Sequence, residues 1–117
     1  MIVISKDVKL VGFDEFDGFT VNKVRETADN IANKYSKMFG DNSLLEFRIM
    51  VDKVREREKH TDYEIKVLFD TTNGHFHAAK TGWKILNVVD EVLTEIERQV
   101  LKKKEKTKDH RRHPDNV

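Results

Sequence analysis

Four stretches of the chain alternate apolar and polar residues, which is the pattern of a strand with one buried face. Residues 45–51 and 63–69 alternate regularly, with Leu45 among the inward positions, whereas residues 1–13 alternate loosely and are bent or interrupted near residues 5–6. Asn73-Gly74 is a tight-turn signal, and it introduces a short strand over residues 74–80. The charged residues 53–62 predict a long, mobile hairpin connection.

Two further stretches repeat apolar residues every three or four positions, as amphipathic helices do. In the first, the apolar stripe extends from Val21 to Met38, with Thr20 as the predicted N-cap and Gly40 placed to end the helix. The acidic and aromatic residues 12–18 (GFDEFDG) form the connection before it. The second helix is predicted to begin near residues 81–82, and its core stripe consists of Leu86, Val89, Leu93, Ile96 and Val100.

The order strand, helix, three strands, helix predicts an α+β fold. Helices with one apolar stripe and strands with one apolar face can bury these apolar surfaces against each other if both helices pack on the same face of the sheet. We therefore expect a two-layer β-α-β-β-β-α sandwich with a four-stranded sheet. One domain should cover residues 1–106, followed by a mobile charged tail over residues 107–117, which lacks apolar periodicity and holds the only proline.

The opposite face of the sheet is predicted to be solvated. Its apolar residues are few, with Met50 and Leu68 the main ones, and this face could serve a homodimeric protein-interaction module as an alternative function. The sequence leaves the oligomeric state open. The charged residues predicted there are Glu46, Arg48, Asp52, Glu64 and Lys66.

Composition restricts the class of protein without selecting a partner. The chain has 117 residues, 38% of them hydrophobic, which is enough for one domain with a core. Lys and Arg number 22 against 21 acids, so any case for nucleic acid rests on where the charges lie. The lack of cysteine excludes disulfides and thiolate metal sites. Neither a signal peptide nor an apolar run of roughly 20 residues is present, so we expect a soluble, cytoplasmic protein with no membrane partner.

Support for catalysis is limited to His75 and His77, which are two apart on a predicted strand and so point to the same side. Asp70 or Glu64 could supply a third metal ligand, which makes a metal-binding domain or small metalloenzyme an alternative. The simpler interpretation is that both histidines occupy the polar face. The sequence has no glycine-rich phosphate loop and no nucleophile elbow. We therefore expect no enzymatic activity, no cofactor and no bound metal.

Basic residues cluster at two places on the predicted helices. Lys23, Lys34 and Lys37 share one narrow sector of the first helix, away from its apolar stripe. Such clusters neutralise nucleic-acid phosphates, although cations near a helix C-terminus also stabilise the helix dipole. The aromatic side chains, Trp83 among them, are predicted to occupy core or turn positions rather than to stack on bases. The second cluster, at the end of the last helix, contains Arg98, Lys102, Lys104 and Lys106.

The last third of the chain resembles the short members of the ribosome hibernation-promoting factor and ribosome-associated inhibitor family. The similarity lies in His77-Ala78, in Val89-Asp90, and in residues 96–100 (IERQV) followed by alternating lysines. It differs in residues 12–18 and in Trp83, which stands where the family usually has another residue.

The resemblance implies a fold related to double-stranded RNA-binding domains and a role in ribosome hibernation. It implies binding of ribosomal RNA in the decoding channel of the small ribosomal subunit, which blocks the messenger and transfer RNA sites, with neither DNA nor membrane as a partner. The residues implied to face RNA phosphates are Lys23, Lys34, Lys37, Arg98, Lys102, Lys104 and Lys106.

Overall fold

The structure, a computed structural model, describes residues 2–3, 8–40 and 42–116, and side chains within 8–40 and 42–103. The predicted order of elements is confirmed, and the first predicted strand corresponds to two short strands. In chain order the elements are β1 (Ile2–Val3), β2 (Val8–Val11), α1 (Gly18–Phe39), β3 (Leu44–Glu56), β4 (Thr61–Thr71), β5 (Gly74–Gly82) and α2 (Ile85–Asn116).

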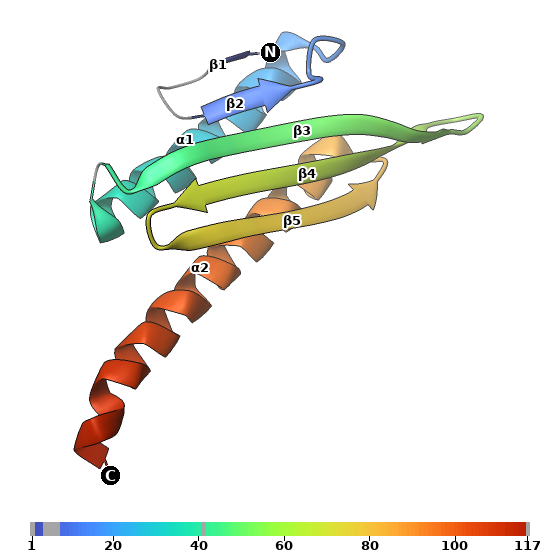
Figure 1. The fold of residues 1–117 in the computed structure, drawn as a ribbon. Helices are drawn as coiled ribbons and strands as arrows, with labels where there is room; N and C mark the ends of the chain where they lie inside the picture. The colour runs from blue at the N-terminus through green and yellow to red at the C-terminus, as the bar shows by residue number, and fades with distance from the viewer. Residues whose placement is uncertain (1, 4–7, 41, 117) are drawn as a thin grey trace.

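The strands form one mixed sheet in the order β1-β2-β3-β4-β5 (Figure 1). β2 and β3 run parallel, with Val8 opposite Phe47, and α1 makes the crossover between them. All other neighbours are antiparallel. Both helices cover the same face of the sheet, and α2 continues well past its edge (Figure 1). The predicted α+β, two-layer architecture is therefore confirmed, with β1 as a two-residue addition to the four expected strands.

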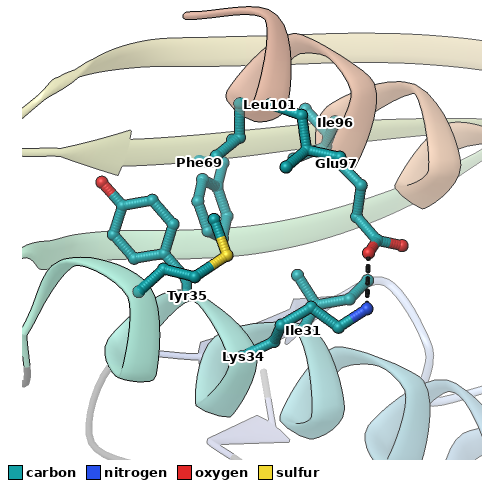
Figure 2. Close-up of a pocket in the computed structure, with 9 residues that line it drawn as sticks. Ile31, Lys34, Tyr35, Phe69, Ile96, Glu97 and Leu101 are labelled. Carbon is teal, nitrogen blue, oxygen red and sulfur yellow. Dashed lines mark hydrogen bonds and ion pairs between the residues drawn. The ribbon is translucent and has the colours of Figure 1, made fainter. Parts of the chain in front are cut away.

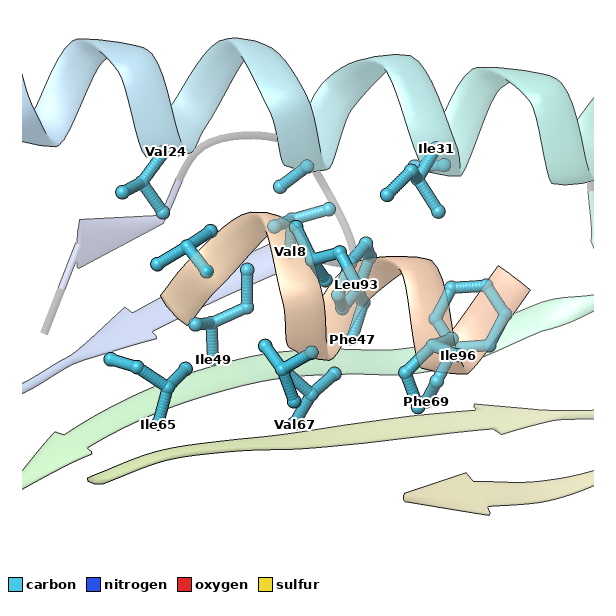
Figure 3. Packing of buried hydrophobic residues seen from close by; sticks show 14 of the residues in the cluster. Val8, Val24, Ile31, Phe47, Ile49, Ile65, Val67, Phe69, Leu93 and Ile96 are labelled. Atoms are coloured by element: carbon cyan, nitrogen blue, oxygen red, sulfur yellow. The ribbon is translucent and has the colours of Figure 1, made fainter. Parts of the chain in front are cut away.

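The core lies between the sheet and the two helices, where both helical stripes meet the inward faces of the strands (Figure 3). Val24 of α1 and Ile96 of α2 are fully buried, as is Phe69 of β4. Phe69 packs edge-on against Phe47, with ring centroids 4.9 Å apart. The tight packing fixes the angle at which both helices lie on the sheet, and so fixes which of their side chains remain outside.

The acidic and aromatic connection before α1 is a packed segment. Phe13 is buried, and Phe16 contacts both Phe13 and Tyr63 of β4 at centroid distances of 5.6 and 5.3 Å. The predicted N-cap Thr20 was wrong, because Asp17 occupies that position and its Oδ1 accepts a hydrogen bond from the Thr20 N–H at 3.0 Å. α1 therefore begins earlier than predicted.

Several predicted boundaries also differ from the structure. The hairpin connection is short, since β3 and β4 pair as far as Glu56 and Thr61, and the Arg57 N–H donates to the His60 carbonyl across the tip. β5 extends to Gly82, which pairs with Tyr63, and this delays the start of α2 to Ile85.

α2 continues to Asn116, beyond the helix end expected at residue 106. Half of residues 101–116 are Lys, Glu or Arg, which propagate a helix well without any apolar face. Residues 107–116 of the predicted tail are thus helical, and residue 117 lies outside the described residues. The domain limits of 1–106 and the mobility of the tail stay predictions.

Leu45 was wrongly predicted to point inward. The β3–β4 register shifts between Leu44 and Glu46, which places Leu44 in the core and leaves Leu45 56% exposed. Beyond this bulge the predicted alternation holds. Figure 1 shows no helix on the opposite face of the sheet, where Arg48 pairs with Glu46. No helix within the described residues is both long and apolar enough to span a bilayer.

Candidate nucleic-acid interface

The three predicted lysines of α1 are exposed and lie within about 60° of one another around the helix axis. Lys37 makes no ion pair with any described residue. Lys23 makes a long, exposed pair with Glu26 at 3.9 Å, and its Nζ also lies 5.6 Å from the centre of the Phe19 ring. These two ammonium groups are open to a phosphate, because exposed ion pairs of this kind exchange at little cost.

Lys34 has a different environment. Its Nζ donates a hydrogen bond to Oε2 of Glu97 on α2 at 3.1 Å, as the dashed line in Figure 2 shows. The pair spans an apolar cavity of about 80 Å³ between the helices, into which Tyr35 and Leu101 also project. The sequence predicted Lys34 only as an RNA contact, but the structure also makes it a link between α1 and α2.

The segment of α2 that carries the family resemblance bonds this helix to both α1 and β5. Glu97 binds Lys34 of α1, and two positions later Gln99 Nε2 donates to the His77 carbonyl oxygen of β5 at 3.1 Å. Between them Arg98 pairs with Glu95 at 2.7 Å. The hydrogen bond from Gln99 and, secondarily, the charge of Arg98 lower the pKa of Glu95. The Glu-Arg-Gln sequence thus has a structural explanation.

The predicted cations of α2 lie on a different flank from the α1 lysines. At 3.6 residues per turn, Arg98 is about 100° and Lys102 about 140° from Glu97, which marks the side facing α1. Lys102 and Lys103 are exposed and have no ion partner among the described residues. Figure 1 places this part of α2 at the same end of the sheet as the C-terminus of α1. The side chains of Lys104 and Lys106 lie outside the described ones.

The geometry gives little support to a metal site. His75 Nδ1 lies 2.9 Å from Oδ1 of Asp70, as the predicted strand pairing allows. The described residues contain no group of three or more His, Cys, Asp or Glu that could hold a metal ion. On the same face Met50 and Leu68 are half-buried rather than exposed, so they offer less apolar surface to a partner than the sequence suggested.

Trp83 was predicted to occupy a core or turn position, and the core alternative is wrong because it is 53% exposed. It stands with Lys84 in the link between β5 and α2, so it belongs to neither apolar pattern. The ring of His60, at the β3–β4 hairpin, lies 5.0 Å from the Trp83 ring, and Lys84 Nζ lies 5.1 Å from its centre. The adjacent Gly82 and Lys84 were the sequence signal for an aromatic residue outside the core.

Comparison with known proteins identifies the family. No curated protein matches the chain. A family model described as "Hibernation factor Hib, C-terminal domain" matches residues 7–117 and so covers almost the whole chain. This match confirms the resemblance to hibernation factors and, with it, the functional class of ribosome binding and translation regulation. The chain belongs to the family of the C-terminal domain of hibernation factor Hib.

Proposed function

We propose that this protein binds the small ribosomal subunit in its decoding channel and keeps messenger and transfer RNA out of their sites. The observation that carries the proposal is the exposed lysine sector of α1 in a chain of the Hib family. Phosphate contacts of this kind give affinity and orientation without reading base sequence. The mechanism is steric occlusion in the cytoplasm, and it requires neither a catalytic residue nor a cofactor.

The cations differ in how readily they would reach phosphate. Lys37 and Lys102 are exposed and have no described acidic partner, so they are the first candidates. Lys23 and Arg98 would exchange a surface carboxylate for a phosphate, which changes little in free energy because exposed ion pairs contribute only about 0–1 kcal/mol. Lys34 would have to leave Glu97, so we assign it mainly to holding α1 against α2.

Local charge matters here because the net charge is only +1. Lys37 belongs to the last turn of α1 and Lys102 to the part of α2 that leaves the sheet, and these two segments lie at one end of the molecule (Figure 1). The helical continuation of α2 to Asn116 extends this end outward from the domain. A projecting basic helix suits insertion between RNA segments better than docking on a flat surface, which supports a channel as the site.

A competition experiment tests occlusion directly. Small subunits are incubated with the protein, then offered labelled messenger RNA and initiator transfer RNA. We expect the protein to lower the bound fraction of both RNAs, and excess RNA to displace the protein. The double variant K37E/K102E should lose this effect at equal protein concentration. A stable complex that holds the protein, messenger RNA and transfer RNA together would contradict the proposal.

A further inference from the structure

Trp83 is an exposed aromatic residue in a position that folding does not require. It is the only tryptophan of the chain, it is 53% exposed, and it follows the last residue of β5. The buried aromatic residues Phe47 and Phe69 show that the core is filled from other positions. About half of the Trp83 side chain is therefore open to a partner.

The surroundings of Trp83 hold it in place. His60 stacks beside it with the ring planes inclined at 32°. Asp62 keeps His60 in position, since Oδ1 lies 3.5 Å from His60 Nε2 while Oδ2 accepts a hydrogen bond from Arg57 Nε at 2.9 Å. The hairpin tip and the β5–α2 link therefore form a pre-arranged aromatic platform with a cation, Lys84, at its ring.

We infer that Trp83 stacks on an unpaired base of the bound RNA while Lys84 binds an adjacent phosphate; this inference rests on the proposed function. Aromatic rings stack on the π-face of any base, and lysine supplies the charge that the neighbouring phosphate needs. Stacking would orient the domain on RNA without demanding a sequence, which complements the phosphate contacts of α1 and α2.

A second aromatic–lysine pair supports RNA over a protein partner. Phe19 in the first turn of α1 is 65% exposed, and Lys23 Nζ lies 5.6 Å from its ring centre. The starts of α1 and α2 lie at the same end of the sheet (Figure 1), so both pairs belong to one end of the molecule. Pairing of each exposed ring with a lysine matches the alternation of base and phosphate in a single strand.

The fluorescence of the sole tryptophan gives a direct test. The full chain is titrated at low salt with an unstructured uridine 12-mer, with deproteinised small-subunit ribosomal RNA, and with uridine monophosphate. We expect quenching by both RNAs and none by the mononucleotide. Equal quenching by the mononucleotide would overturn the inference in favour of a free-nucleotide site. A signal with intact subunits but none with deproteinised RNA would overturn it in favour of a ribosomal protein.

Variants separate this inference from the proposed function. We expect W83A to bind small subunits about ten-fold more weakly with an unchanged salt dependence, because stacking adds no charge contact. W83F should keep most of the affinity. The control L45A removes an apolar side chain that is similarly exposed but not aromatic, and it should bind as the wild type does. W83A binding like the wild type would overturn the stacking role alone, whereas a wild type that fails to bind would overturn the proposed function.

Discussion

Lys34 Nζ lies 3.1 Å from Glu97 Oε2, and this contact joins the C-terminal part of α1 to α2 beside the apolar cavity between them. The side chains are 65% and 34% exposed, so the pair contributes at most about 1 kcal/mol. The packing of the core sets how the two helices lie, and the pair adds a polar contact between them. A residue expected to bind RNA thus also supports the fold.

Reversal of the charge at Lys34 should therefore destabilise the protein. K34E places two carboxylates together, and we expect the free energy of unfolding to fall by about 1 kcal/mol. The charge swap K34E/E97K should recover most of this loss, and K37E should lower stability much less. Urea unfolding of the four proteins measures the effect. Equal stability of K34E and K37E would show that the contact has no role in solution.

Charge reversal at Lys37 should weaken ribosome binding more than the same change elsewhere on α1. Arg25 is the matched control, because it is exposed, has no described ion partner, and lies at least about 120° round the helix from the three lysines. We expect K37E to lower small-subunit affinity and to reduce the salt slope by about 1, while R25E changes neither. Equal losses for both variants would mean that only net charge matters.

The cap of α1 should titrate in acid. Hydrogen bonds from Thr20, first from its side chain and then from its backbone N–H, hold the pKa of Asp17 below its ordinary value of 3.8. A lowered folded-state pKa stabilises the protein fully above pH 3.8, and the contribution is lost as the pH falls through the lower pKa. Thermal unfolding should show that the wild type is more stable than D17A. This difference in stability should shrink as the pH falls from 3.8 through the lowered pKa of Asp17. The advantage of D17N over D17A should not shrink.

Three glycines should respond differently to alanine. Gly12 has φ +85° and a Cβ there would lie 2.5 Å from the Val51 carbonyl oxygen, so G12A should destabilise by more than about 2 kcal/mol. Gly40 has φ +105° with open space around it, and G40A should cost about 1 kcal/mol. A Cβ placed at Gly18 would have no neighbouring atom within 4 Å, so G18A should be neutral or stabilising. Equilibrium unfolding ranks the three, and any other order would contradict this account.

The element order was predictable because each element repeats its apolar residues at its own period. That pattern failed where one extra residue entered a strand, as at Leu45, whose direction depends on the β3–β4 bulge. It also failed at Trp83, whose exposure depends on how far β5 pairs along β4. Both outcomes follow from pairing between distant segments, which a single sequence does not display.

The candidate interface was only partly predictable for a similar reason. Helical spacing correctly placed Lys23 and Lys37 on an exposed sector, since this requires only the period of α1. The partner of Lys34 depends on how α1 and α2 lie against each other, which the packing of the core determines. The assignment of the cations to RNA phosphates stays a prediction.

Sedimentation of the purified protein with small ribosomal subunits across a salt series tests the central claim most directly. We expect stoichiometric binding near 50 mM salt that weakens steeply toward about 200 mM, as release of counterions from RNA phosphates requires. The slope should fall in K37E and remain unchanged in R25E. Absence of binding at low salt, or binding that does not depend on salt, would contradict an interface built on RNA phosphates.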